Sequence, residues 1–522
     1  MSRLLRLGHI RQLATSSLRG ERAQDITRVP LSVPLQKFAD NKGKAPAAWE
    51  LKPFQTEISK TESGIRIATE PHFGEYCTIG IVIDSGARYE CGYPLGTSHL
   101  IEKLAFGSTL KHLSRDDIYG VLEKNGALID CQSTKDTFLY AASCLSSGLD
   151  EVMEILCNAI WRPRITHEEF EEAKTIIVYE NQDMAQRIEC EPLLTDWIHT
   201  AAFRDNTLGF SKYTSDETLD KITMKHVFSY MSQYHSPERI VVSGVGVSHQ
   251  DLKAAVQKHL DWKTTTWSKN PDLLLPNVPS IDNSISQYTG GEVRMEKDLS
   301  KLAVGTPYPN LAHVVLGFQG VGYKDDDFVA FCVLQSLLGG GGSFSAGGPG
   351  KGMYTRLYTE VMNRCYWVYA ATAFNHSYAD GGLFCIQASS DPAMINNVLI
   401  VLFDQFLRLL QGVHKEELDR AKIQLKSQLM MNLEIRPVMF EDMSRQVMGH
   451  GTRRKPDEYM EKIDLVTNKD IIRVAERMMS HRPSLVGYGD IKLLSSYQAL
   501  DDAVARKSID ELKQKKKVFS WQ

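Results

Sequence analysis

Long hydrophobic runs are missing from this 522-residue sequence. A membrane-spanning helix needs about 20 consecutive, predominantly apolar residues. The richest apolar run, residues 398–403, is far shorter, so we expect no transmembrane segment. The composition, 43% apolar and 24% charged, is instead typical of a globular protein that is too long for a single core.

Cysteine is scarce and follows no pattern. The nine cysteines are odd in number and never form a Cys-x-x-Cys pair. Neither a disulfide framework nor a cysteine zinc site is therefore supported. We expect mostly buried thiols in a reducing compartment.

Acidic residues are few in the first 33 positions. This segment holds six arginines but two acids, together with serines and with leucines spaced along one helical face. Such a composition is typical of a mitochondrial transit peptide, and a disordered basic tail is the alternative. Without residues 1–33 the formal charge falls from −4 to −8, because the segment carries a net +4. An acidic protein favours basic partners, and we expect no nucleic-acid partner.

The two halves of the sequence resemble each other. Three matched pairs have offsets of 234, 246 and 248: Tyr89 with Tyr323, 137–143 with 383–389, and 168–174 with 416–422. Coincidence is the alternative, but two independent offsets agree within two residues. The offset grows by about a dozen residues, which predicts an insertion in the second half, where a glycine-rich segment lies.

The repeated unit predicts the fold class. Two closely spaced strands, 126–131 and 138–142, are joined by a short polar turn, which indicates antiparallel pairing. We therefore expect an α+β protein with two homologous domains, each a largely antiparallel sheet packed with helices. A continuous parallel α/β sheet fits less well. The predicted N-terminal domain is 50–262, the linker is the Asn-, Pro-, Ser- and Asp-rich stretch 263–301, and the C-terminal domain is 302–510.

A damaged metal motif lies on a predicted helix over residues 96–106. His99, Glu102 and Lys103 follow the spacing H-x-x-E-H, in which two histidines bind zinc and the glutamate activates a water molecule. Lys103 stands where the second histidine would be. Since an ammonium group has no lone pair, zinc should bind weakly or not at all.

The same helix offers Thr97 or Ser98 as a cap. Glu180 follows Lys103 by 77 positions on a later predicted helix and falls at a third ligand position. We hypothesise that Lys103 takes the place of the metal and pairs with Glu180 or Glu102. Without Glu180, a surface or packing role would be the better interpretation of the motif.

The glycine-rich segment, residues 339–352, holds eight glycines. It fails the phosphate-binding pattern G-x-x-x-x-G-K-[ST], because Gly350-Lys351 is followed by Gly352 and Ser345 stands five positions before Gly350. A flexible linker is one alternative. A long loop inside a domain and before a predicted helix over 353–361 is more often functional, and bare backbone groups suit pairing with an extended peptide.

At these residues the chain resembles the pitrilysin-type metallopeptidases of peptidase family M16, over about residues 50 to 500. The likeness rests on the broken motif, on Glu180 at its spacing and on the glycine-rich segment. It implies the LuxS/MPP-like metallohydrolase fold and a non-catalytic subunit with no metal of its own. Zinc is expected in a catalytic beta subunit of the heterodimer.

The resemblance also implies a substrate and a location. This subunit would bind basic presequences of mitochondrial precursor proteins in the mitochondrial matrix or at the inner membrane. Aligning residues 360–369 with the family places Tyr369 at a substrate-contacting tyrosine and Met362 where active members have an arginine. The implied substrate-binding residues are Gly339, Gly340, Gly341, Gly342, Ser343, Phe344, Ser345, Ala346, Gly347, Gly348, Pro349, Gly350, Lys351, Gly352 and Tyr369.

Two other functions remain open. A peptidase active on its own would use His99, Glu102 and Glu180 with a substitute ligand, which Lys103 opposes. A core subunit of a respiratory bc1 complex would share the ancestry and the lost zinc ligands. The glycine-rich segment argues against this third function.

Overall fold

The structure is a computed structural model that describes residues 55–188, 190–260, 263–306, 308–342 and 353–513. These residues belong to one compact unit that begins at Gln55. The predicted transit peptide and residues 343–352 of the glycine-rich segment lie outside the described residues.

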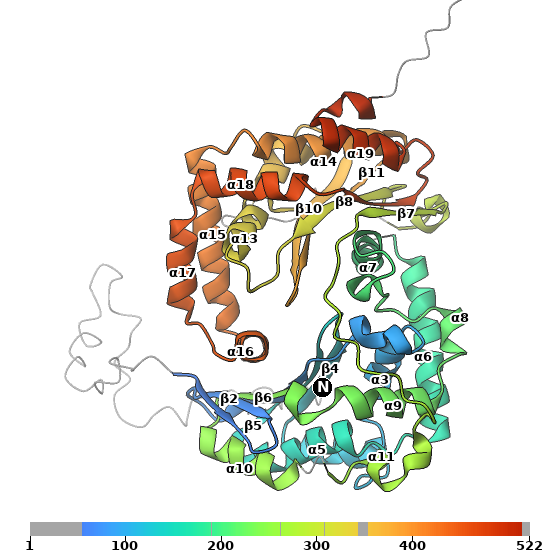
Figure 1. Cartoon of the computed structure of the whole chain (residues 1–522), viewed down its shortest axis with the longest axis vertical. Helices are drawn as coiled ribbons and strands as arrows, with labels where there is room; N and C mark the ends of the chain where they lie inside the picture. The colour runs from blue at the N-terminus through green and yellow to red at the C-terminus, as the bar shows by residue number, and fades with distance from the viewer. Residues whose placement is uncertain (1–54, 189, 261–262, 307, 343–352, 514–522) are drawn as a thin grey trace, which may run out of the picture. The chain divides into compact units, whose positions relative to one another are not determined.

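Two six-stranded sheets form the framework (Figure 1). The first contains β1 (Glu57–Lys60), β2 (Arg66–Glu70), β3 (Tyr76–Ile83), β4 (Leu128–Ser133), β5 (Phe138–Leu145) and β6 (Ile240–Val245). The second contains β7 (Gly291–Glu296), β8 (Ala312–Gly320), β9 (Gly340–Gly342), β10 (Val368–Ser377), β11 (Gly382–Ser390) and β12 (Ser484–Gly489).

Five strands of each sheet repeat one topology, and β1 and β9 are additional edge strands without a counterpart. Their strand orders are β1-β2-β6-β3-β5-β4 and β7-β12-β8-β11-β10-β9. In each sheet four of the five pairings are antiparallel, and the parallel ones are β2 with β6 and β7 with β12. The predicted α+β class with largely antiparallel sheets is confirmed, as is the hairpin of β4 and β5.

The helices pack against these sheets and against one another. They are α3 (Thr97–Leu104), α4 (Arg115–Lys124), α5 (Leu149–Trp161), α6 (His167–Gln186), α7 (Glu191–Ala202), α8 (Asp216–Leu219), α9 (Met224–Tyr234), α10 (His249–His259), α11 (Thr266–Lys269), α12 (Ser300–Ala303), α13 (Phe328–Leu338), α14 (Ile395–Leu409), α15 (Lys415–Leu433), α16 (Arg436–His450), α17 (Pro456–Leu465), α18 (Asn468–Met479) and α19 (Tyr497–Arg506).

Two predicted elements are wrong in detail. The predicted linker 263–301 contains β7, a polar and half-exposed edge strand that pairs with β12 through its backbone, so no apolar run signals it. The apolar helix predicted over 353–361 is instead a short π-helix, η8 (Leu357–Met362). Its buried residues pack into the second core, and Gly339 and Gly340 lie close to the turn that precedes it.

Helices α7 and α16 each cover the sheet of the other half (Figure 1). Helix α16 packs on the first sheet through the following buried residues: Met439, Phe440, Met443 and Val447. Helix α7 packs on the second sheet through Leu194, Ile198, Ala201 and Ala202. Because each half supplies part of the other's core, we expect the two sheets to unfold together.

One helical stretch among the described residues, Pro392–Leu409, has the length and composition to cross a membrane. Half of this stretch is buried inside the protein. Helix α14, which makes up most of it, contacts β8 and β11 and contributes Leu399, Phe403 and Phe406 to the second core. Burial of this kind is what a core helix requires.

Candidate functional site

Helix α3 begins differently from the sequence-based prediction. Its N-cap is Gly96 in the left-handed region (φ 87°), and neither Thr97 nor Ser98 caps it. The buried carboxylate of Glu90 does so instead, accepting hydrogen bonds from the backbone N–H groups of Gly96 at 2.5 Å and Ser98 at 2.6 Å. Burial raises the pKa of Glu90 to about 7, although the hydrogen bonds from Ser98 lower it. The cap comes from a preceding turn, which local capping patterns do not reveal.

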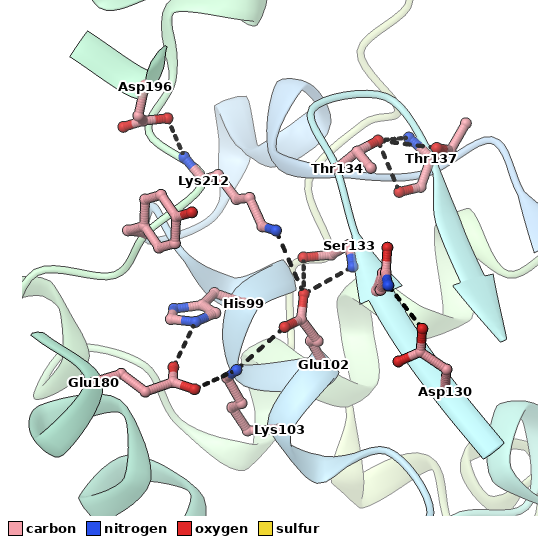
Figure 2. A network of polar contacts seen from close by, with 12 residues as sticks. His99, Glu102, Lys103, Asp130, Ser133, Thr134, Thr137, Glu180, Asp196 and Lys212 are labelled. Atoms are coloured by element: carbon pink, nitrogen blue, oxygen red, sulfur yellow. Dashed lines mark hydrogen bonds and ion pairs between the residues drawn. The ribbon is translucent and has the colours of Figure 1, made fainter. Parts of the chain in front are cut away.

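The structure brings all four residues of the damaged motif together (Figure 2). The Nζ atom of Lys103 lies 2.7 Å from Oε1 of Glu180 and 3.2 Å from Oε1 of Glu102. The Nε2 atom of His99 lies 3.2 Å from Oε2 of Glu180. Residues 99 and 103 share one face of α3, and α6 presents Glu180 to that face. Both pairings hypothesised for Lys103 are present.

Glu102 is fully engaged by neighbouring groups. Its Oε2 atom accepts hydrogen bonds from the N–H of Ser133 at 2.7 Å and from its hydroxyl at 2.8 Å. Lys212 approaches the same oxygen at 3.9 Å. Burial alone would raise the pKa of Glu102, but the charge of Lys212 and the Ser133 hydrogen bonds lower it. Glu102 is therefore an ionised carboxylate whose two oxygens already accept hydrogen bonds, one from Ser133 and one from Lys103.

The proton on His99 is placed by Thr214. The backbone N–H of Thr214 donates to Nδ1 of His99 at 3.3 Å. A nitrogen that accepts a hydrogen bond carries no proton, so the ring proton lies on Nε2 and points at Glu180. In a zinc site Nε2 would need a lone pair for the metal, and Nδ1–H would then face a second donor.

Asp196 on α7 holds the loop that carries Lys212 and Thr214. Its carboxylate accepts from the hydroxyl of Ser211 at 2.7 Å and from the N–H of Lys212 at 3.0 Å. The buried ammonium of Lys135 balances this charge at 2.6 Å. Helix α7 thus orders the loop around His99 while it also covers the second sheet.

The electrostatics of the cluster fit an ion-pair network. Burial would raise the pKa of Glu180, but hydrogen bonds from His99 and Lys103 lower it to about 2. Burial lowers the pKa of Lys103, and its bonds with Glu180 and Glu102 raise it by more. The positive charges of Lys103 and Lys212 balance the two carboxylates without any ion.

Zinc does not fit these side chains. The ammonium of Lys103 occupies the space between the two carboxylates, and the Nε2–H of His99 points at the same place. Among the described residues no group of three His, Cys, Asp or Glu side chains could hold a metal ion. The ion pairs can hold α3 against α6, but these side chains offer no ligand set for a Lewis acid such as zinc.

The start of the glycine-rich segment forms β9, which pairs with β10 at a position with no equivalent in the first sheet. A Cβ atom on Gly340 would lie 2.0 Å from the carbonyl oxygen of Ala371, and one on Gly341 would lie 2.5 Å from the hydroxyl of Tyr358. Both glycines also have positive φ. Only glycine fits here, and the predicted insertion begins as an edge strand.

Tyr369 lies on β10 beside that strand. Its ring packs edge-on against Tyr308, with centroids 6.1 Å apart. Met362 is buried in the second core and offers no charge. The structure leaves the substrate-binding role of Tyr369 as a prediction.

Several residues of the cluster were missed from the sequence. They come from the turn before α3, the end of β4, helix α7 and the loop that follows α7: Glu90, Ser133, Asp196, Lys212 and Thr214. No spacing pattern marks them. Their positions follow from sheet and helix packing alone.

Comparison with known proteins places this geometry in context. The family described as insulinase (peptidase family M16) matches residues 66–215, and the family described as peptidase M16 inactive domain matches residues 221–425. The chain is 51% identical to the mitochondrial-processing peptidase subunit alpha of Caenorhabditis elegans, covering 93% of this chain and 94% of that protein. It is 42% identical to the subunit of that name from Bos taurus, covering 87% of this chain and 85% of that one. The Solanum tuberosum subunit is 29% identical, over 93% of this chain and 91% of its own length.

Proposed function

This chain belongs to the M16 peptidase family, and we propose that it is a substrate-recognising subunit of a mitochondrial processing peptidase that performs no chemistry itself. The names of its relatives support the assignment to that peptidase. They favour this function over a core subunit of a respiratory complex. Cleavage would take place in a separate catalytic beta subunit.

The ion pair between Lys103 and Glu180 carries the non-catalytic part of the proposal. An M16 peptidase needs a metal to polarise the scissile carbonyl and to activate water. In this chain an ammonium group fills the space, and the oxygens of Glu102 are occupied by Ser133 and Lys103. The described side chains of this cluster offer neither a ligand set for a metal nor a free general base.

Substrate recognition is supported by the glycine-rich segment. The described part, Gly339–Gly342, sits at a sheet edge where the backbone comes close to Ala371 and Thr355 without side chains between. Such an edge suits pairing with an extended peptide of varied sequence. We assign residues 339–352 and Tyr369 to this role. The basic presequence would reach the zinc of the partner in the mitochondrial matrix or at the inner membrane.

The test is reconstitution. Purified chain, and the chain mixed with a partner subunit that carries an intact H-x-x-E-H motif, are each incubated with a presequence peptide, and cleavage is followed by mass spectrometry. We expect no cleavage by the chain alone and cleavage by the mixture that exceeds that by the partner alone. Cleavage by the chain alone would overturn the proposal, as would a mixture no more active than the partner.

A further inference from the structure

A cavity of about 590 Å³ lies apart from the cluster around Lys103. One wall is apolar and comes from the second half, with Phe328 on α13, Leu425 on α15 and Ile463 on α17. The polar part of the lining includes Asp84 and Asp136 from the first half, together with three cationic side chains: Arg88, Lys324 and Arg445. Its volume lies within the range of about 300–1,000 Å³ that is common for ligand sites.

The fold repeat relates Asp136 to a second aspartate. The turn between β4 and β5 is closed by a hydrogen bond from the N–H of Thr134 to the carbonyl of Thr137, at 2.8 Å. The turn between β10 and β11 is closed in the same way by Tyr378 and Gly381, also at 2.8 Å. Asp136 and Asp380 each occupy the third position of these turns. The two carboxylates are therefore equivalent in the repeat.

Asp380 has the guanidinium partner that a buried carboxylate needs. Arg88 donates to its two oxygens at 3.0 and 2.6 Å, and the N–H of Ser286 adds a third hydrogen bond at 2.8 Å. This bidentate pair joins the first half of the chain to the second. It is the strongest geometry available to an ion pair of this type.

Asp136 lacks the equivalent partner. In the register that matches Tyr89 with Tyr323, Arg88 corresponds to Gly322, which has no side chain. Among the described residues the ion pair of Asp136 is with Arg445, at 4.0 Å, and Arg445 donates to Glu441 at 2.8 Å. Asp136 itself lines the cavity.

The pKa values of two acids in the cavity are shifted upward, as expected for buried carboxylates without a cationic hydrogen-bond partner among the described residues. Burial raises the pKa of Asp136 by more than the charges of Arg445 and Arg88 lower it. Burial likewise raises the pKa of Asp442, which lines the same cavity, despite the charge of Arg453. A positive charge placed next to such a carboxylate would stabilise its ionised form.

We propose that this cavity binds an arginine side chain of a basic, amphipathic peptide. The guanidinium occupies the place beside Asp136 that Arg88 takes beside Asp380, and a neighbouring apolar side chain of the peptide lies against Phe328, Leu425 and Ile463. Arginine suits the place better than lysine, because its planar fork matches both oxygens of a carboxylate. The inference rests on the proposed function, since it names how part of a presequence is recognised.

The experiment uses the full chain and a fluorescent synthetic peptide with the sequence of residues 1–33, which carries arginines beside leucines. A second peptide has every arginine replaced by citrulline, which keeps the shape and removes the charge. Binding is measured by fluorescence anisotropy for the wild type, for Asp136→Asn and for Asp419→Asn, a control on the exposed side of α15.

We expect Asp136→Asn to weaken binding of the arginine peptide about tenfold, the loss typical of a charged hydrogen bond. The control should bind like the wild type, and Asp136→Asn should not weaken citrulline-peptide binding further. Thermal unfolding checks that the variants are folded. If the Asp136→Asn variant does not fold, Asp442→Asn replaces it. We expect Asp442→Asn to weaken binding of the arginine peptide by a smaller factor and to leave binding of the citrulline peptide unchanged.

The outcomes separate the two proposals. Equal binding of the arginine peptide by wild type and Asp136→Asn would overturn the arginine site and leave the proposed function in place. A loss of binding on Asp136→Asn that is equal for the arginine and citrulline peptides would likewise overturn the arginine site and leave the proposed function in place. No binding of the arginine peptide by the wild type, together with no effect of the chain on cleavage by the partner, would overturn the proposed function.

Discussion

The ammonium of Lys103 lies 2.7 Å from the carboxylate of Glu180, although 77 positions separate the two residues. The pair joins α3 to α6 at the damaged H-x-x-E-H motif. Because Lys103 also reaches Glu102 at 3.2 Å, its ammonium bridges the two carboxylates, and Lys212 beside Glu102 supplies the second positive charge. Charge balance of this kind explains how the helices stay together without an ion.

Replacing Lys103 by methionine should destabilise the protein by about 1–2 kcal/mol, because two partly buried carboxylates would lose their cation. Urea unfolding measures this loss. Lys253→Met, at an exposed position on α10, is the matched control and should change stability by less than about 0.5 kcal/mol. Equal effects of the two substitutions would show that the ion pair contributes nothing.

The cap of α3 predicts a pH dependence. Burial raises the pKa of Glu90 to about 7, against the hydrogen bonds from Ser98 that lower it, while its ordinary value is 4.5. Between these pH values the folded protein holds a proton that the unfolded chain releases. The stability contributed by the protonated form is therefore complete below about pH 4.5 and is lost as the pH rises towards 7.

A Glu90→Gln variant cannot titrate at this position, so its stability relative to the wild type should improve as the pH rises from about 5 to about 8. Urea unfolding of both proteins at several pH values gives the difference, in which the other titrating groups cancel. A difference that moves in the opposite direction would mean that Glu90 is ionised in the folded protein throughout this range.

Because α7 and α16 each cover the sheet of the other half, we expect the two halves to unfold in a single transition. Phe440 of α16 is almost fully buried against the first sheet, and a Cβ on Gly80 of β3 would lie 2.6 Å from its ring. Phe440→Ala should cost about 3–5 kcal/mol because it leaves a cavity there. Circular dichroism and tryptophan fluorescence should still show one coincident transition. Separate transitions would mean that the halves are independent.

The glycine strand predicts a defect in substrate use. Gly340→Ala would place a Cβ atom 2.0 Å from the carbonyl of Ala371 at a φ of 109°, so β9 must leave β10. We expect presequence cleavage by the reconstituted peptidase to fall, with assembly of the two subunits unchanged. Gly120→Ala, on α4 with open space around it, is the control. Unchanged cleavage kinetics with Gly340→Ala would argue that the segment is only a linker.

Much of the fold could be predicted from the sequence. The hairpin of β4 and β5 follows from two short apolar strands around a polar turn, and the doubled topology follows from the offsets between matched segments. The spacing of His99, Lys103 and Glu180 was sufficient to expect that they meet. These features depend on local pattern or on a motif of fixed spacing.

The remaining features depend on contacts between distant residues. The cap of α3 comes from Glu90, since the left-handed Gly96 turns the chain so that a side chain from the preceding turn reaches the helix N-terminus. The donor that fixes the tautomer of His99 is a backbone N–H in the loop at Thr214, and a backbone group leaves no mark in the sequence. The sequence also did not indicate that α7 and α16 each cover the sheet of the other half, because the pattern of an amphipathic helix does not show which sheet it packs on.

Zinc content tests the central claim most directly. The untagged full chain is purified, dialysed against a low concentration of zinc and measured by inductively coupled plasma mass spectrometry, with an M16 peptidase that has both histidines as the positive control. The account predicts no stoichiometric zinc in this chain, because Lys103 and the proton on His99 occupy the metal position. One zinc per chain that is lost on Glu180→Gln would contradict it.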